Sequence, residues 1–116
     1  MNYGEPVHGE VSSANASGGV TVLLYPAGST AARALASGEF LAVTDYAIIL
    51  TVGGAFALVA DADTAGERIV KGSVAALGGA VSNLSTPFAC AEGITPVLIA
   101  DAGQVDCVIN GYITQV

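Results

Sequence analysis

The sequence predicts an all-β protein, an antiparallel β-sandwich of the jelly-roll type with about eight strands and an extended N-terminal arm. Short apolar or alternating segments recur along the 116-residue chain, and turn residues separate them at nearly regular spacing. The segment from Gln104 to Thr114 alternates most clearly. It places Val105, Cys107 and Ile109 on one face, as a half-buried strand requires. The length fits one domain.

The first nineteen residues are polar, small and rich in glycine. We expect residues 1–19 to form an extended or loosely ordered arm, with at most a short strand near 10–12. We expect residues 20–116 to form the sandwich. The first ten residues have no basic start and no apolar run, so we expect no secretory signal in this sequence.

The first half of the predicted sandwich contains three strands. Residues 20–25 (VTVLLY) form a β-branched strand that ends at Pro26. Residues 46–52 and 55–60 read as two further strands, and the glycine pair between them is typical of a two-residue hairpin. Residues 30–37 are rich in alanine and fit either two turns of helix or a loop.

The second half continues the strand pattern. Residues 61–66 (DADTAG) predict a polar loop, and residues 67–74 a strand. Residues 77–81 and 87–91 flank SNLST, which is rich in turn residues, and residues 95–100 form a short apolar strand. The long C-terminal strand completes the set.

Charge excludes two classes of partner. Ten acidic residues face only Arg33, Arg68 and Lys71, which gives a net charge of −7. Such a chain is repelled by phosphate backbones and by anionic membranes, so we expect no nucleic acid and no membrane as partner. The apolar stretches are also far shorter than the ~20 residues of a membrane-spanning helix.

The composition points to assembly. Of the residues, 53% are hydrophobic and 11% are charged, and the mean hydropathy is +0.65. Ordinary soluble domains carry roughly 25% charged residues. A sandwich with so little charge has to hide apolar surface against copies of itself or against a partner. The composition therefore favours a structural, assembling protein over an enzyme.

Candidate catalytic residues are few. His8 is the only histidine and lies in the predicted arm, which is a poor place to hold a base against a nucleophile. Cys90 and Cys107 have no cation nearby in the sequence to lower a thiol pKa. Both lie among apolar neighbours in strand-like segments, so we expect buried free thiols, and the sequence leaves open whether the two pair. We expect no catalytic residue and no cofactor site.

A metal site is not expected either. The segment DADTAGE, residues 61–67, places Asp61, Asp63 and Glu67 at spacings that superficially suggest a calcium loop. The twelve-residue calcium pattern puts its glutamate eleven positions after the first aspartate, and this segment does not. We therefore expect a solvated turn there.

Three tyrosines leave a second function open. Tyr25, Tyr46 and Tyr112 could stack against sugar rings, as in a carbohydrate- or receptor-binding sandwich of a phage or secreted protein. The interpretation we prefer is that they line the core or subunit contacts. An enzyme on a cupin-type barrel is a third alternative, and a single histidine makes it the weakest.

The second half of the chain, over residues 41–116, resembles the small jelly-roll head-decoration (cement) proteins of tailed bacteriophages. The resemblance is carried by the apolar strand PVLIA, the acidic turn DAGQVD and the closing strand INGYIT. It implies a protein without catalytic residues or cofactors, located on the outer surface of the virion. It also implies a homo-oligomer, a trimer in preference to a dimer, that binds over the junctions between major capsid proteins and braces the shell. Residues 1–19 would be the arm that crosses the capsid surface.

Overall fold

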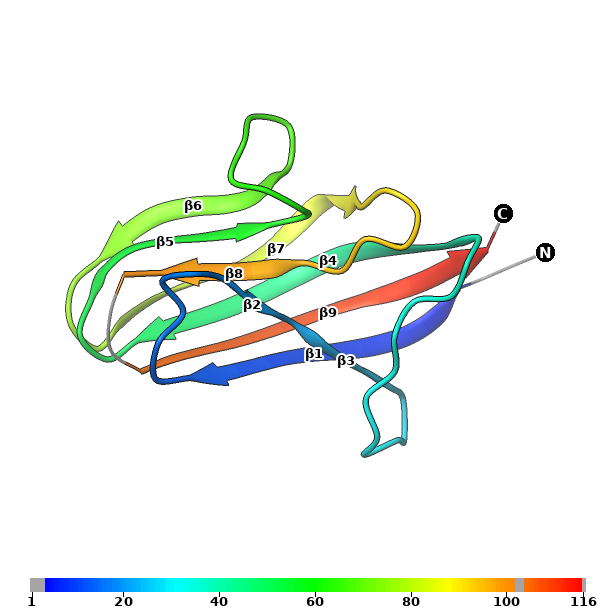
Figure 1. Cartoon of the computed structure of the whole chain (residues 1–116), viewed down its shortest axis with the longest axis horizontal. Coiled ribbons are helices and arrows are strands. Elements are labelled where there is room, and N and C mark those ends of the chain that lie inside the picture. Colours follow the sequence, from blue (N-terminus) through cyan, green and yellow to red (C-terminus); the bar gives the residue numbers. More distant parts are fainter. Residues whose placement is uncertain (1–3, 102–103, 116) are drawn as a thin grey trace.

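A computed structural model describes residues 4–101 and 104–115, which form nine strands in two antiparallel sheets (Figure 1). The five-stranded sheet has the order β3-β1-β9-β4-β7, and the four-stranded sheet has the order β2-β8-β5-β6. The strands are β1 (Glu5–Ser13), β2 (Val20–Thr21), β3 (Leu23–Pro26), β4 (Glu39–Leu50), β5 (Gly54–Val59), β6 (Arg68–Val74), β7 (Gly78–Ala89), β8 (Val97–Ala100) and β9 (Val105–Gln115).

The strand order defines a jelly roll. The chain crosses from one sheet to the other between β1 and β2, β2 and β3, β4 and β5, β6 and β7, β7 and β8, and β8 and β9. Repeated crossing of this kind, with every described pair antiparallel, produces the two Greek keys of a jelly roll. The predicted fold class is therefore confirmed. Among the described residues there is no helix long and apolar enough to cross a membrane.

The core lies between the sheets and is densely filled. The large side chains that are less than 2% exposed include Leu24, Leu41, Ile48, Leu50, Leu58, Leu98 and Ile109. The accessible surface is 5942 Å², close to the about 5,800 Å² expected for a folded monomer of this mass. Apolar side chains that remain on the outside are therefore not a result of loose packing.

The N-terminal segment is not an arm. β1 lies between β3 and β9 and pairs with β9 at every one of its positions. Val7 and Val11 are buried, and Gly9 lies between them on the same inward face. The predicted arm over residues 1–19 is thus wrong for this strand, because its small polar residues alternate with a short apolar set that the sheet buries. Residues 1–3 of that prediction lie outside the described residues.

The glycine pair between β4 and β5 is a turn but not a hairpin. The two strands belong to different sheets, so the chain crosses the sandwich at Gly53 and Gly54. Both residues have positive φ angles, +85° and +117°. A Cβ on Gly53 would lie 2.6 Å from the backbone nitrogen of Ala76. Glycine is therefore required where this crossing touches the β6–β7 connection.

β7 is continuous where the sequence predicted a turn at SNLST. Its register against β4 changes from Asp45 opposite Asn83 to Val43 opposite Phe88. Residues 84–87 therefore form a bulge, and no turn separates two strands there. The turn-rich composition was the correct sign of an irregularity, but not of its type.

Two further expectations are settled by the structure. The predicted strand 20–25 divides into β2 and β3, which belong to different sheets. Residues 30–37 form a loop that touches β3 through one bridge, between Leu24 and Arg33.

An ion pair fastens this loop to the sandwich. Arg33 donates from Nη1 and Nη2 to the two carboxylate oxygens of Glu39 at 2.9 and 2.7 Å, and from Nε to Glu5 at 3.0 Å. Glu39 is 5% exposed and also accepts a hydrogen bond from the backbone of Ala36. The Arg33 guanidinium, followed by the Ala36 amide, lowers the pKa of Glu39 from its ordinary 4.5 to about 2. The ion pairs of Arg33 with Glu39 and Glu5 thus keep the loop against the outer edge of β3.

The lowered pKa predicts acid sensitivity. Glu39 contributes stability above pH 4.5, and this contribution is lost as the pH falls from 4.5 to about 2. Replacing Glu39 with glutamine should lower the melting temperature at pH 7 by several degrees and flatten its fall over this window. Thermal melts followed by circular dichroism between pH 2 and pH 7 measure both effects. If the melting temperatures of the two proteins coincide at every pH, the ion pair between Arg33 and Glu39 does not stabilise the fold.

Candidate assembly surface

The outer face of the five-stranded sheet divides into an apolar half and a polar half. Strand register places its side chains in rows that cross the sheet from β7 to β3. Three of these rows are Gly79–Ile49–Asp106–Ser12, Val81–Ala47–Val108–Glu10–Leu23 and Asn83–Asp45–Asn110–His8–Tyr25. In the first two rows the β7 and β4 positions are apolar, whereas β9 and β1 carry Asp106 and Ser12 in the first row and Val108 and Glu10 in the second. The apolar half thus lies at the β7 edge.

Four exposed apolar side chains gather there, and together we call them the apolar patch. They are Ile49, Val52, Leu77 and Val81, with exposed fractions of 50, 60, 77 and 77%. The Leu77 amide donates to the carbonyl of Thr51 at 3.1 Å, which brings Leu77 beside Val52. Ile49 lies opposite a glycine, two positions from Val81 on β7. Because that glycine has no side chain to cover Ile49, the patch is open to solvent.

The surroundings of the patch carry little charge. Residues 46–60 and 72–91 contain no Asp, Glu, Lys or Arg. These two stretches supply the end of β4, the β4–β5 crossing, β5, the β6–β7 connection and all of β7. A twelve-residue strand at the edge of a sheet is thus free of ionised side chains.

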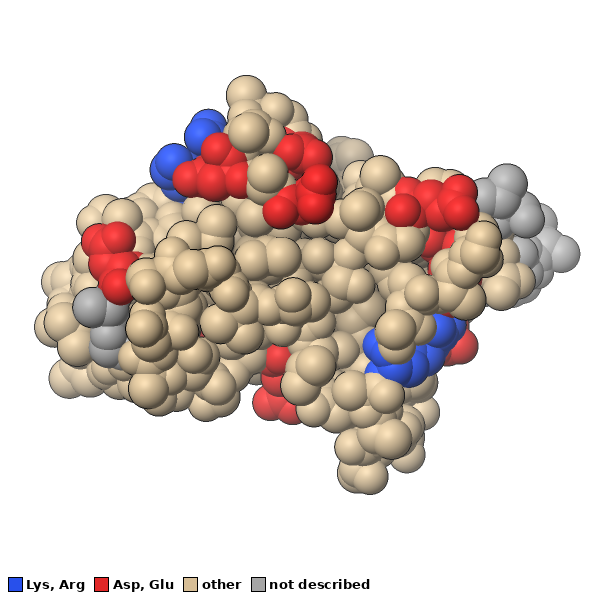
Figure 2. Space-filling view, in the orientation of Figure 1, with Lys and Arg blue, Asp and Glu red and all other residues tan. Residues whose placement is uncertain are grey.

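The charged side chains lie elsewhere, and the three cations are all paired with acids. Arg68 and Lys71 contact the Asp63 carboxylate at 2.6 and 3.0 Å, and these cations hold its pKa below the ordinary value. Arg33 is held by Glu39 and Glu5, so each of the three cations of the chain is in an ion pair. Figure 2 shows the charged side chains in separate groups at the margins of one face, including the β5–β6 loop that projects in Figure 1.

The sheet edges differ in how they are protected. Loop 27–38 covers β3, where the Arg33 amide donates to the Leu24 carbonyl at 2.8 Å. β2 has only two residues, and β6 carries two cations, Arg68 and Lys71. β7 has neither a covering loop in the described chain nor a charge, and only its bulge and Pro87 interrupt it. Natural sheets normally protect such an edge, because its free backbone groups can pair with another chain.

His8 stands on the outer face of β1, opposite Asn110 and Tyr25. Its Nε2 lies 3.3 Å from the Glu10 carboxylate, and its side chain is 44% exposed. This is the environment of a solvated surface residue.

The two cysteines are free and buried, as the sequence predicted. Burial raises the pKa of Cys90 to about 11 and that of Cys107 to about 12. Both are therefore thiols at neutral pH, the form that is a poor nucleophile.

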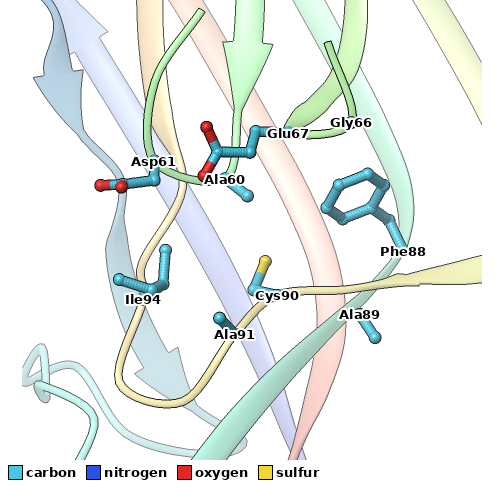
Figure 3. Close-up of a pocket in the computed structure, with 9 residues that line it drawn as sticks. All are labelled: Ala60, Asp61, Gly66, Glu67, Phe88, Ala89, Cys90, Ala91 and Ile94. Atoms are coloured by element: carbon cyan, nitrogen blue, oxygen red, sulfur yellow. The ribbon is translucent and has the colours of Figure 1, made fainter. Parts of the chain in front are cut away.

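Cys90 borders a small pocket between the β5–β6 loop and the segment after β7. Figure 3 shows its sulfur directed into this pocket, between the Phe88 ring and Glu67, while the Asp61 carboxylate points away. The pocket measures about 190 Å³, and a second one beside Arg33 about 240 Å³. Both are smaller than the roughly 300–1,000 Å³ of typical ligand sites.

The acidic loop does not present its carboxylates to one point. Asp63 is occupied by two cations, and Glu67 accepts a hydrogen bond from the Thr64 hydroxyl at 2.6 Å. Among the described residues there is no group of three His, Cys, Asp or Glu side chains placed to hold a metal ion.

Tyr25, Tyr46 and Tyr112 do not form an exposed platform. Tyr46 is 9% exposed and belongs to the core. Tyr25 and Tyr112 are half-buried on the outer face of the five-stranded sheet, and the Tyr112 ring packs against Gly4. This agrees with the packing interpretation of these residues.

Comparison with known proteins gives no family. No family model matches the sequence, and no curated protein matches it. One solved structure with a similar course of the chain is titled "Structure of Eiger TNF from S. frugiperda". It is 14% identical, with a TM-score of 0.43, over 97% of this chain and 92% of that chain. The class of the protein is thus defined by its own strand order, that of a jelly-roll β-sandwich.

Proposed function

We propose that this chain is a non-enzymatic structural protein that assembles with copies of itself and decorates the head of a tailed bacteriophage. It binds on the outer surface of the capsid, over junctions between major capsid proteins, and braces the shell. The resemblance of residues 41–116 to head-decoration proteins indicates that the partner is the capsid. The apolar patch beside an uncharged sheet edge supports the self-assembly.

The apolar patch is the observation that carries the proposal. The core of the sandwich is well filled, so Val81 and Leu77 are exposed because the fold presents them. An interface of about 1,600 Å², roughly two-thirds apolar, gives about 25 kcal/mol of gross stabilisation, whereas lost rigid-body freedom costs about 4–15 kcal/mol. Burial of the four side chains of the apolar patch would supply part of such an interface.

The charge distribution fits a second, different contact with the capsid. The net charge of −7 comes from acids on loops, such as Asp61 and Asp63, and on β1, β4 and β9, whereas β7 carries no charge. These acids suit a basic surface on a capsid protein, while the uncharged edge suits a copy of this chain.

The chemistry of the described residues supports a non-enzymatic role. Both thiols are protonated at neutral pH, and the one histidine is paired with Glu10 at the surface. The pockets beside Cys90 and Arg33 are too small for a typical substrate.

Binding to phage heads tests the function directly. Purified protein should co-sediment with heads of the encoding phage that lack it, and the decorated heads should withstand heating better than bare ones. Bovine serum albumin at the same concentration controls for trapping in the pellet. A protein that stays in the supernatant, or that leaves the thermal stability of the heads unchanged, would contradict the capsid role.

A further inference from the structure

We propose that two copies of this chain pair along β7, with residues 78–83 of one copy lying antiparallel to the same residues of the other. The two five-stranded sheets then become one continuous sheet across a two-fold axis. This inference rests on the proposed self-assembly and specifies the surface and symmetry through which it occurs. The two-fold pair is a dimer, whereas the resemblance to head-decoration proteins favours a trimer.

The first step concerns the backbone of the edge. One side of β7 is bonded to β4, and the opposite side has no neighbouring strand within its sheet in the described chain. Each unpaired N–H and C=O there is a site for a further strand. The edges of β2, β3 and β6 are short, covered or charged. Strand addition is therefore best accommodated at β7.

The second step limits the segment that can pair. Residues 84–87 bulge away from the register with β4, and Pro87 has no N–H to donate. Regular pairing with β4 holds from Gly78 to Asn83. The open and regular part of the edge is thus six residues long, close to the usual length of a strand.

The third step identifies the occupant. Each copy carries a net charge of −7, so two copies repel wherever acids face each other. β7 contains no ionisable residue. Val81 on β7 and Leu77 just before it present apolar surface, which the same residues of a second copy can cover. An antiparallel copy of one strand also offers matching donors and acceptors, and a two-fold axis closes the assembly.

The acids on the neighbouring strands of this sheet are set back from the edge. Asp45 and Asp106 lie on β4 and β9, one and two strands inward from β7. Asp45 accepts a hydrogen bond from the Asn110 side chain at 2.7 Å. Asp106 accepts one from the Ser12 hydroxyl at 2.7 Å.

A pair of matched substitutions tests the edge. Val81→Lys places a charge on β7, whereas Leu23→Lys places the same charge on the same sheet face at the covered β3 edge. The original side chains are 77% and 53% exposed, so both variants should fold. We expect Val81→Lys to weaken self-association at least 100-fold in analytical ultracentrifugation, and Leu23→Lys to associate like the native protein. Equal association of all three proteins would overturn the proposal.

Amide hydrogen exchange gives a second, independent readout. Alternate amides of residues 78–83 are bonded to β4, and the others point away from it. The amides that point away from β4 should exchange slowly in the concentrated native protein and faster on dilution or in Val81→Lys. A native trimer whose β7 amides exchange freely would overturn the strand pairing and leave self-assembly in place. Protection of these amides only after a capsid protein is added would identify another occupant and also overturn it. A native monomer at all concentrations would remove both self-assembly and the pairing.

Discussion

Replacement of Gly111 with alanine is expected to lower the free energy of unfolding by about 3 kcal/mol. Gly111 faces the core from β9, opposite Val43 of β4. The register between β4 and β9 shifts directly after this pair, between Val43 and Asp45. An added Cβ would overlap the carbonyl oxygen of Ala42 and lie 3.3 Å from the Cα of Val43. These neighbours are backbone atoms of a central strand, so relief of the overlap requires β4 and β9 to move apart.

Gly18 provides the matched control for this substitution. A Cβ on Gly18 has no neighbour within 4 Å, and its φ angle is not in the positive range. We expect Gly18→Ala to change the free energy of unfolding by about 1 kcal/mol or less, in either direction. Urea denaturation of both variants at one protein concentration measures the difference. Equal midpoints for the two variants would show that the close approach of β4 to Gly111 is not a constraint.

The second large effect is expected from Ile48→Ala, which should cost about 4 kcal/mol of unfolding free energy. Ile48 is 0% exposed and packs between the sheets, so its removal leaves a cavity in a core with little room to relax. The next residue, Ile49, points to the opposite face of the same strand and is 50% exposed. Ile49→Ala should therefore cost about 1 kcal/mol or less.

This pair is best compared in a protein that carries Val81→Lys. Ile49 belongs to the apolar patch, so in the native protein a loss of association would add to the loss of stability. In the weakly associating background, denaturant titration reports unfolding alone. Similar losses for Ile48→Ala and Ile49→Ala would contradict the inward and outward faces assigned to β4.

The strands that could be predicted are those in which apolar and polar residues alternate, because this alternation shows which face of the strand is buried. From Val105 to Ile113 every second residue faces the core, which the alternation in the sequence indicated. β1 follows the same rule with Val7 and Val11, but the histidine, glycine and glutamate between them and the two serines after them gave the segment the composition of an arm. Its burial depends on pairing with β9, which follows it by about a hundred residues in the chain.

The connections were less predictable, because a turn residue does not specify which sheet the chain enters next. Gly53 and Gly54 fit a hairpin as well as a crossing, and only the placement of β4 and β5 in different sheets distinguishes the two. SNLST has the composition of a turn, and the register of β4 makes it a bulge instead.

The scarcity of charge predicts an assembling surface without placing it on the fold. Val81 is an ordinary apolar residue in the sequence. It becomes part of the proposed interface only because β7 ends the five-stranded sheet and has no charged side chain to protect it.

The most direct measurement of self-assembly is the sedimenting mass of the native chain over a dilution series in the micromolar range. We predict twice the 11.4 kDa of one chain at the upper end, falling toward the single-chain mass on dilution. A mass of 11.4 kDa at every concentration would contradict self-assembly through the β7 edge.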